Sequence, residues 1–440
     1  MKKNKKLLYY IEKAHNWYDP RLKKKAGYAI ITLRYCVYLC RESGWGLFMS
    51  DFKVREDWVQ FCLPDISDAE VDAVGAAVRS GWWAKGPRTI EFEKRFAEYV
   101  GAKYCVGLNS CTAAQHLALL ANGIGAGDEV ITTPLTFAST ANTILHVGAT
   151  PVFADIDPDT GLIDPKEIEK KITDKTRAIV PVHYSGLAAD LGEIEKLCDK
   201  YNLFLSEDAA HAVETRYNGN LIGHQPKGAV CYSFYATKNL ACGEGGALIT
   251  DDEELAQKAR VLSCHGMSAG AWNRYGKGGS WRYDIEEPGY KYNMFDLQAA
   301  LASVQLDRMD DMQRRRFECV DVYEEAFKDV PQLRLQKTPA YCHHSRHLYI
   351  LRIVPEMLTI SRDQFIEEIK ARNVGVSVHF IALHTMSAYT KRFGFKPEDF
   401  PNAFAFSESE ISLPLYSTLG KENAQYVADA VLDVVNKYKR

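Results

Sequence analysis

A lysine stands between a strand-like run and a glycine cluster in CYSFYATKNLACGEGG, residues 231–246. The run before Lys238 is rich in aromatic side chains, and the segment 243–246 cannot hold an ordinary helix because of its three glycines. A lysine at such a break is either a charge on a surface loop or a reactive amine. An ammonium that loses contact with water gives up its proton readily, and the neutral amine is a nucleophile that forms Schiff bases.

Two further polar groups stand just after predicted strands upstream of this lysine. Asp208 and His211 lie in SEDAAHA, and a carboxylate placed there must be paired or hydrogen-bonded because burying a lone charge is costly. Ser110 and Thr112 open a helix in NSCTAA, where unpaired backbone N–H groups form an anion site suited to a phosphate. Taken singly, Asp208 is equally well explained as a structural acid or a metal ligand, and Ser110 as a plain helix cap.

One cofactor requires all these parts together. Pyridoxal phosphate needs a lysine for its aldehyde, an acid for its pyridine nitrogen and an anion site for its phosphate. Ser233, five residues before Lys238, adds a hydroxyl for the phosphate. The three weak signals occur in a suitable order, so together they predict a pyridoxal-phosphate site.

The elements that must position these residues are strands and helices in alternation. From about residue 60, short apolar runs alternate with amphipathic stretches, which predicts βα units around a parallel sheet buried on both faces. Such sheets bind ligands outside the carboxyl ends of their strands, where the residues above are found. The predicted strands cover residues 103–108, 129–134, 150–157, 178–186 and 203–211.

The pattern changes after about residue 300 to that of a smaller α+β domain. We expect one long helix or two joined helices over residues 296–330, strands at 347–354 and 376–381, and helices at 361–374 and 421–438. The chain is therefore predicted to have a basic extension at 1–58, a large cofactor-binding domain at 59–305 and a small domain at 306–440.

Composition excludes several other classes of protein. A net charge of −3 over 440 residues gives no sign of nucleic-acid binding. Eleven cysteines include no CxxC pair, so neither a zinc ribbon nor a disulfide framework is indicated. Cys342, His343, His344 and His347 suggest a metal, but no second pair of ligands has zinc-finger spacing, and no metal is expected. Reduced, buried thiols in a cytosolic enzyme fit better.

The first 48 residues differ from the rest, with eleven Lys/Arg and three Asp/Glu. Their apolar run AGYAIITLRYCVYLC is interrupted by Arg34 and is shorter than the ~20 residues of a bilayer span. No small-residue cleavage site follows it. We expect a poorly structured extension, or sequence translated ahead of a start at Met49. The alternative is a helix that lies on a membrane surface or recruits a partner.

Six blocks of the sequence resemble the signature blocks of the DegT–DnrJ–StrS nucleotide-sugar aminotransferases, which are fold-type-I pyridoxal-phosphate enzymes. The blocks read NSCTAAQHLAL, TTPLTFASTANTILHVGATPVFADID, PVHYSG, EDAAHA, SFYATKNLACGEGGALIT and GYKYNMFDLQAALASVQL. The resemblance extends from about Phe61 to SLPLY at 412–416 and the last helix. It implies an α/β fold with a mainly parallel, seven-stranded sheet between helices, followed by a smaller α+β domain.

The resemblance also implies roles for residues around the cofactor ring. Lys238 matches the lysine that binds the cofactor and then moves a proton during transfer, and Asp208 matches the acid at the pyridine nitrogen. His211 stands where the family has Gln or His bonded to the phenolic oxygen. Phe137 matches the aromatic residue that stacks on the ring.

Further residues match the family's phosphate contacts. The helix start and the strand end supply Ser110, Thr112, Ala113 and Ser233. The GYKYNM block matches a segment that reaches the phosphate of the partner subunit. There Lys291 replaces a common Asn, and Asn293 is the second candidate. Cys111 replaces a common Gly and leaves a thiol near the cofactor.

The resemblance implies transamination of a nucleotide-linked keto sugar by a cytoplasmic homodimer with shared active sites. Glutamate is the expected amino donor, and the product serves amino-sugar, polysaccharide or lipopolysaccharide biosynthesis. GYKYNM resembles the branch that acts on 4-keto sugars of UDP or another nucleotide. The alternatives are a 3-keto-6-deoxyhexose aminotransferase and a non-catalytic regulator on the same fold. Trp82 and Trp83 either line the substrate or simply pack, and Lys85 either meets a diphosphate or stays solvated.

Overall fold

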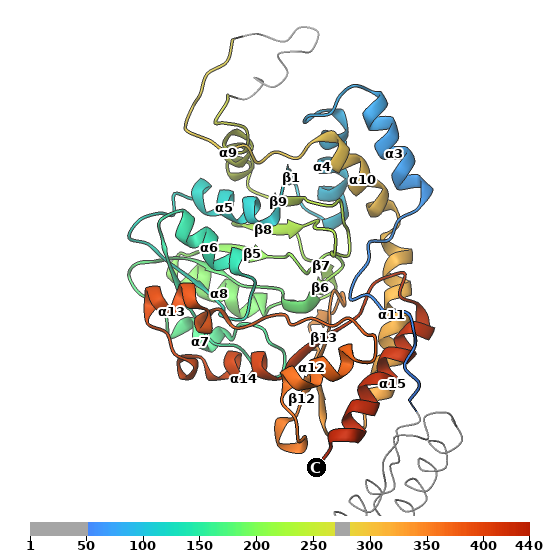
Figure 1. Ribbon diagram of the computed structural model, residues 1–440. Helices are drawn as coiled ribbons and strands as arrows, with labels where there is room; N and C mark the ends of the chain where they lie inside the picture. The colour runs from blue at the N-terminus through green and yellow to red at the C-terminus, as the bar shows by residue number, and fades with distance from the viewer. Residues whose placement is uncertain (1–51, 269–281) are drawn as a thin grey trace, which may run out of the picture. The chain divides into compact units, whose positions relative to one another are not determined.

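Seven strands form the central sheet in the computed structural model, which describes residues 52–268 and 282–440 (Figure 1). Their order across the sheet is β1-β9-β8-β5-β4-β2-β3, and of these seven only β9 runs against its neighbours. The strands are β1 (Tyr104–Leu108), β2 (Glu129–Thr132), β3 (Thr150–Phe153), β4 (Thr176–Val180), β5 (Phe204–Asp208), β8 (Gly228–Ser233) and β9 (Gly246–Thr250). The predicted fold class, with a mainly parallel seven-stranded sheet, is confirmed.

The reversal of β9 brings the glycine cluster to the edge where the other six strands end. Leu108, the last residue of β1, and Ser233, the last residue of β8, both pair with Gly246. A Cβ atom on Gly246 would lie 2.4 Å from the backbone nitrogen of Cys111, so only glycine lets the helix after β1 begin so close to the sheet. The predicted anion site and the end of β8 therefore lie side by side.

Helices cover both faces of the sheet, because adjacent residues of each strand point to opposite sides. Val106 of β1 packs on the side of α5 and α9, whereas its neighbour Cys105 packs on the side of α4 and α10. Burial on both faces explains why these strands are unbroken apolar runs. The helices are α3 (Asp68–Arg79), α4 (Pro87–Val100), α5 (Cys111–Ala121), α6 (Ala138–His146), α7 (Pro165–Glu169), α8 (Leu191–Tyr201), α9 (Glu253–Ser263) and α10 (Asp296–Asp307).

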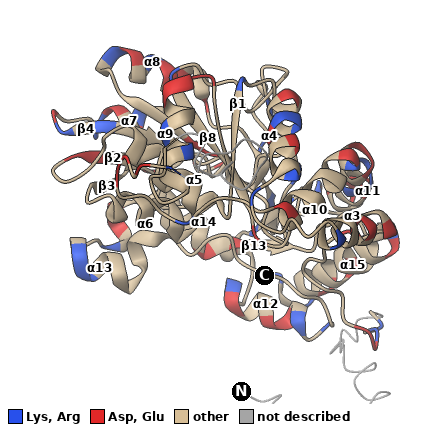
Figure 2. Ribbon diagram, turned by 90° about the horizontal axis from the view of Figure 1, so that it is seen from above, with Lys and Arg blue, Asp and Glu red and all other residues tan. Residues whose placement is uncertain are grey.

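The C-terminal part holds a three-stranded antiparallel sheet of order β10-β12-β13. The predicted long helix is two helices, since α10 ends at Asp307 and α11 begins at Met309. Positively and negatively charged residues are spread along helices such as α3, α11 and α15 (Figure 2). The elements are α11 (Met309–Phe327), β10 (Leu333–Leu335), β12 (Tyr349–Ile353), α12 (Arg362–Lys370), α13 (Ser387–Phe393), α14 (Pro401–Ser409), β13 (Glu410–Leu413) and α15 (Gly420–Tyr438).

Short elements complete the described chain. A second small sheet of order β11-β6-β7 is formed from β6 (Arg216–Tyr217), β7 (Asn220–Leu221) and β11 (Cys342–His343). The 3₁₀ turns are η2 (Tyr184–Gly186), η4 (Pro355–Met357), η5 (Leu383–Thr385) and η6 (Pro397–Asp399). No helix in the described ranges is both long and apolar enough to cross a bilayer.

The predicted N-terminal extension falls mostly on residues 1–51, which lie outside the described residues. Residues 52–58 are described and lie against α15, where the Arg55 N–H donates to the Tyr426 hydroxyl at 3.0 Å. Val59 forms a parallel bridge with Val374. The division into an extension, a large domain and a small domain remains a proposal.

The predicted strand at 376–381 is wrong. In this run only Ser377 forms a bridge, to Ser412 of β13. Two residues after Ser377, the backbone N–H of His379 donates to the Glu410 side chain at 2.8 Å instead of to a neighbouring strand. The β-branched pattern predicted a continuous ladder, but the chain leaves β13 here to present His379 to a cavity.

Gly246→Ala tests the close approach between β9 and α5. We expect the variant to lose about 1–3 kcal/mol of unfolding free energy, because the added methyl group must displace backbone. Gly75→Ala is the matched control. Its Cβ would meet only the flexible end of Arg79 at 3.4 Å, so helix propensity should raise stability by up to about 1 kcal/mol. Thermal unfolding of the two variants and the wild type measures both effects, and equal midpoints for all three would contradict the packing argument.

Candidate active site

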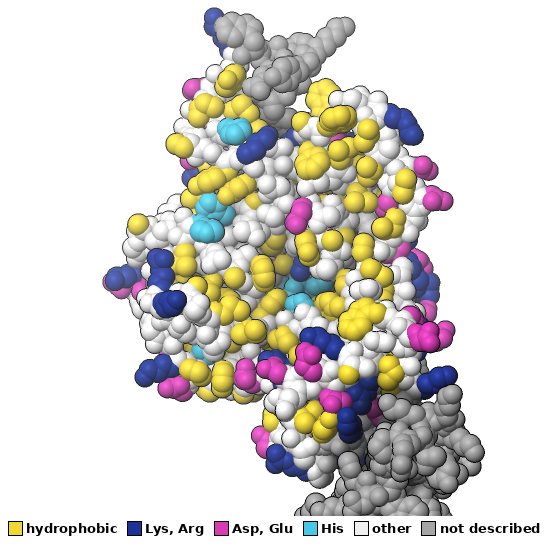
Figure 3. Space-filling model, in the orientation of Figure 1, with side chains coloured by type: hydrophobic (Ala, Val, Ile, Leu, Met, Phe, Trp, Pro, Cys, Tyr) yellow, Lys and Arg dark blue, Asp and Glu magenta, His cyan; other side chains and the backbone are white. Residues whose placement is uncertain are grey.

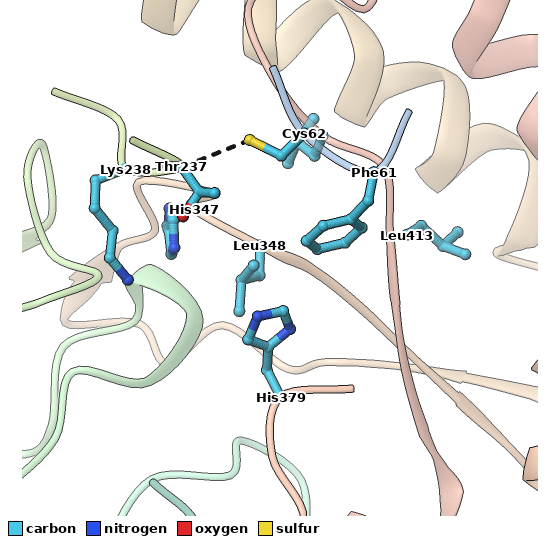
Figure 4. A pocket seen from close by; sticks show the side chains of 9 residues that line it. Phe61, Cys62, Thr237, Lys238, His347, Leu348, His379 and Leu413 are labelled. Atoms are coloured by element: carbon cyan, nitrogen blue, oxygen red, sulfur yellow. Dashed lines mark hydrogen bonds between the residues drawn. The ribbon is translucent and has the colours of Figure 1, made fainter. Parts of the chain in front are cut away.

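Lys238 lies just past the carboxyl end of β8, in a turn where its N–H donates to the Tyr235 carbonyl at 2.8 Å. Its side chain enters a small cavity (Figure 4). Burial lowers the pKa of Lys238 to about 8, and among the described residues no acceptor bonds the ammonium. The cavity is lined by Phe61, Cys62, Thr237, Lys238, His347, Leu348, His379, Leu413 and Leu415. Lys238 is therefore a poorly solvated amine rather than a charge on a surface loop.

Asp208 ends β5 and is 3% exposed. The Thr140 hydroxyl donates to Oδ2 at 2.8 Å, and the Ala210 N–H donates to Oδ1 at 3.1 Å. Since Thr140 donates its one proton to the carboxylate, Thr136 must donate to Thr140 across their 2.8 Å contact. Only neutral groups hydrogen-bond this carboxylate in the described chain. The Asp208 carboxylate can therefore accept a charge-assisted hydrogen bond from a ligand, such as one with a protonated ring nitrogen.

Three imidazoles surround the lysine, and burial lowers the pKa of each, to about 3 for His379 and well below the usual range for His211 and His347. The rings of His211 and His347 lie 4.4 Å apart. The Ser185 N–H donates to Nδ1 of His211 at 3.2 Å, so the ring proton is on Nε2. His211 therefore offers an N–H donor, which is what a phenolic oxygen of a cofactor accepts. Figure 3 shows histidine side chains in the hollow at the middle of this face.

The predicted phosphate site lies at the start of α5. Ser110 caps this helix, because its Oγ accepts the Ala113 N–H at 3.1 Å. Ser110 is thus a helix cap, as one of the two interpretations predicted. A phosphate bound here must share the Ala113 N–H with the Ser110 hydroxyl. The N–H groups of Cys111 and Thr112 have no carbonyl partner within the helix. They stay available to an anion.

The remaining phosphate candidates lie on neighbouring elements. Ser233 is 7% exposed at the end of β8, next to Gly246. Lys291 Nζ donates to Asn293 Oδ1 at 2.7 Å, and Asn293 bridges Leu108, just before the start of α5. The structure thus brings the GYKYNM block beside its own helix start. Its predicted reach to a partner subunit stays a prediction.

Phe137 is the N-cap residue just before α6 and is 63% exposed, with its ring centroid 6.1 Å from that of Phe380. Its open face leaves room for a stacked ring. Cys111 is buried, with its thiol donating to the Cys231 carbonyl at 3.2 Å. Burial raises the pKa of this thiol well above its usual value, so the cysteine is an unreactive packing group in this state.

Three other residues singled out in the sequence make structural contacts. The indole N–H of Trp82 donates to the Lys85 carbonyl at 3.1 Å, and that of Trp83 to the Val78 carbonyl at 3.0 Å. The Lys85 ammonium pairs with the buried Glu93 at 2.9 Å, so Lys85 is not a solvated charge. Among the described residues, no group of three or more His, Cys, Asp or Glu side chains is placed to hold a metal ion.

Sequence reasoning missed three residues of the site. Thr140 lies in one of the six family-like blocks, but the sequence predicts no function for it. His347 is predicted only as a possible metal ligand, and His379 only as part of a strand. His347 is oriented by Asn239, which follows Lys238 and accepts its Nδ1–H at 3.1 Å. A histidine inside the apolar run VSVHFI was the one available signal for His379.

The donor set fits pyridoxal phosphate. An amine that no described residue bonds, a buried carboxylate held by neutral groups, an N–H donor and a helix start lie at one edge of the sheet. Each matches one polar part of the cofactor: the aldehyde, the ring nitrogen, the phenolic oxygen and the phosphate. The arrangement allows the lysine to act as nucleophile and proton carrier.

Comparison with known proteins agrees with this fit. The model of the DegT/DnrJ/EryC1/StrS aminotransferase family matches residues 64–432. The spore coat polysaccharide biosynthesis protein SpsC of Bacillus subtilis (strain 168) is 51% identical over 382 residues, which are 87% of this chain and 98% of SpsC.

Solved structures give the same result. The structure named "Putative sugar aminotransferase Spr1654 from Streptococcus pneumoniae, PLP-form" is 34% identical with a TM-score of 0.79, over 86% of this chain and 99% of that chain. Helicobacter pylori PseC, an aminotransferase involved in the biosynthesis of pseudoaminic acid, is 30% identical with a TM-score of 0.80, over 87% of this chain and 100% of that chain.

The lowered pKa of Lys238 has a measurable effect on stability. Below pH 8 both folded and unfolded chains carry the ammonium, so the folded apoprotein bears the full cost of burying it. Between pH 8 and 10.5 only the unfolded chain keeps this proton, so the cost fades as pH rises.

Lys238→Met removes that cost. We expect it to raise the unfolding free energy of the apoprotein at pH 7 by about 3 kcal/mol, and at pH 9.5 by about 1.4 kcal/mol. Denaturant unfolding at the two pH values measures this difference. A gain that does not change with pH would indicate an ordinary surface lysine.

Thr140→Val tests the support of Asp208. The variant keeps the side-chain shape but removes the donor to a buried carboxylate, so we expect a loss of about 1–3 kcal/mol of unfolding free energy. Thr140→Ser keeps the hydroxyl and should retain the interaction. If thermal unfolding ranks the serine variant below the valine variant, the hydrogen bond is not what supports Asp208.

Proposed function

The chain belongs to the DegT/DnrJ/EryC1/StrS aminotransferase family, and we propose that it transfers an amino group from glutamate to the keto carbon of a nucleotide-linked sugar. The observation that carries the proposal is the poorly solvated Lys238 amine, which no described residue bonds, near the buried carboxylate of Asp208. The predictions of an aminotransferase and of pyridoxal phosphate as its cofactor are confirmed by the family.

The roles of the residues follow from their chemistry. When bound, pyridoxal phosphate accepts the electron pair of a C–H bond broken beside the substrate nitrogen. Lys238 is the residue that would hold the cofactor, and the amino donor would free it. The free amine would then move the proton between the carbon beside the substrate nitrogen and the carbon of the cofactor that bears this nitrogen. Asp208 keeps the ring nitrogen protonated. His211 donates its Nε2–H to the phenolic oxygen, and Phe137 stacks on the ring.

The phosphate is bound where α5 starts. Ser110, Thr112 and Ala113 supply donors there, together with the Ser233 hydroxyl, and the positive end of the helix dipole favours the anion. Lys291 or Asn293 completes this site, in a homodimer with shared active sites.

A 4-keto sugar of UDP or another nucleotide is the preferred substrate, and a 3-keto-6-deoxyhexose is the alternative. SpsC is named for spore coat polysaccharide biosynthesis, and PseC for the biosynthesis of pseudoaminic acid, which supports a role in amino-sugar, polysaccharide or lipopolysaccharide biosynthesis. A cytoplasmic location fits the cysteines, since all nine in the described ranges are free thiols.

The experiment is a panel of 4-keto and 3-keto nucleotide sugars with glutamate as donor. The purified protein with added pyridoxal phosphate should be coloured, and its absorbance should shift when glutamate is added. Product should form with a 4-keto sugar first. A coloured protein whose spectrum responds to glutamate but which aminates no keto sugar would contradict the proposed substrate.

Lys238→Ala should abolish turnover, by a factor beyond the ~10⁴ that proton transfer alone supplies, because it removes both the covalent attachment and the proton carrier. Lys85→Ala is the matched control, since this lysine is paired with Glu93. It should keep turnover. Turnover by the Lys238 variant would overturn the mechanism, and its circular dichroism spectrum checks that it is folded.

A further inference from the structure

A carboxyl group buried in the small sheet is connected to the cavity that holds Lys238. Glu410 and Ser412 of β13 are both 0% exposed. Ser412 Oγ forms a hydrogen bond with Glu410 Oε1 on one side and lies 2.8 Å from His379 Nδ1 on the other. The second carboxyl oxygen, Oε2, accepts the His379 N–H at 2.8 Å. A continuous line of hydrogen bonds therefore runs from Glu410 through Ser412 to the imidazole.

The imidazole of His379 is held so that one nitrogen remains for the cavity. Its ring stacks on Phe61, with centroids 5.6 Å apart and planes 22° apart, and Tyr184 donates a hydrogen bond to its carbonyl. Because Nδ1 faces Ser412, Nε2 is the nitrogen left for the cavity that His379 lines together with Lys238 (Figure 4). A substrate bound at Lys238 comes within the reach of this nitrogen.

Protonation of the three groups depends on burial. Desolvation raises the pKa of Glu410 to about 8, and no cation pairs with its carboxyl group in the described chain. Arg362 is nearby but bonds the Glu410 backbone carbonyl at 3.0 Å rather than the carboxyl group. When Glu410 is ionised, Ser412 donates to Oε1. Burial favours the carboxylic acid instead, in which the proton on Oε1 is donated to Ser412. Ser412 then donates to Nδ1, which leaves the ring proton on Nε2.

We propose that Glu410, Ser412 and His379 form a proton wire that delivers a proton to the carbonyl oxygen of the substrate as it leaves as water. The inference rests on the proposed function, because a keto substrate must lose this oxygen when it is aminated. His379 is the donor that faces the substrate, and Glu410 and Ser412 act through it.

The transfer balances without any other reagent. The Nε2–H bond of His379 breaks as a new O–H bond forms on the departing oxygen. Ser412 passes its proton to Nδ1, and Glu410 passes its own to Ser412, which leaves a carboxylate at Glu410. The attacking amine supplies the two protons of the water overall. One moves from its nitrogen to the oxygen as the C–N bond forms, and the other leaves the nitrogen as the C=N bond forms and restores the wire.

Other charged or titratable groups lie near the wire but form no hydrogen bond with its side chains in the described chain. Arg352 of β12 stands opposite Glu410, and no ion pair joins the two side chains. Lys238, His211 and His347 face His379 from the large domain and the start of β12, and none is hydrogen-bonded to it. Tyr184 lies near Glu410, but burial raises the pKa of its hydroxyl, which is bonded to a carbonyl. Within the described residues, Ser412 is the one hydrogen-bond partner of the His379 side chain.

The tautomer of His379 tests the wire without cofactor or sugar. Full-length protein labelled with ¹⁵N-histidine is titrated by NMR, and His379→Gln identifies the signal. Below pH 8 the wild type should carry the ring proton on Nε2. Above pH 8 the carboxylate draws the Ser412 proton, so the ring proton should move to Nδ1.

Glu410→Gln should lock the proton on Nε2 at every pH, because the amide donates to Ser412 permanently. Ser412→Ala should also abolish the switch. Glu408→Gln, an exposed neighbour, is the matched control and should keep it. Turnover on the keto sugar should fall about 100-fold in Glu410→Gln and stay at the wild-type level in Glu408→Gln.

Two results would overturn the wire: a wild-type tautomer that does not change with pH, or a Glu410→Gln variant with wild-type turnover. If no keto sugar is aminated, the proposed function fails, while the tautomer switch still decides whether the wire exists. A switch that is present in the wild type and absent in Glu410→Gln supports the wire in either case.

Discussion

Desolvation of one ammonium is the constraint on which the site depends. Lys238 must lose its proton readily to act as a nucleophile, so the groups around it must not stabilise the ammonium. The structure meets this condition by surrounding the amine with neutral imidazoles and by engaging the nearest carboxylate, Asp208, with a hydroxyl and an N–H. A carboxylate placed against Lys238 would instead fix the ammonium as an ion pair and raise its pKa.

The apolar packing around the sheet offsets the free-energy cost of burying these two groups. Its strands are buried on both faces, and the large apolar clusters on each side stabilise the fold enough to hold a desolvated lysine and a buried acid at the edge. The reversed strand β9 matters for the same reason. It lies between β1 and β8 and begins with Gly246, which lets α5 start close to the end of β8.

The sequence was sufficient to predict the sheet, the cofactor and the residues at the ends of strands. Asp208, Ser233 and Lys238 each follow an apolar run, and parallel strands bring such positions together without further information. His347 and His379 were beyond this reasoning, because they come from the C-terminal part and enter the cavity through packing that no local pattern encodes. The misplaced strand at 376–381 has the same origin, since a side chain of β13 replaced the expected backbone partner.

The groups near the large sheet and those near the small sheet differ in charge. The large sheet supplies the groups that we propose to hold a charged cofactor: a carboxylate, a helix start and an amine. Strand β13 supplies Ser412 and Glu410, and the segment beside it supplies His379. Burial opposes the ionisation of His379 and Glu410. A proton donor next to Lys238 has to be of this kind, because an imidazolium would repel the ammonium. Storing the proton on Glu410, one serine away from His379, keeps it available to the substrate without placing a charge beside the lysine.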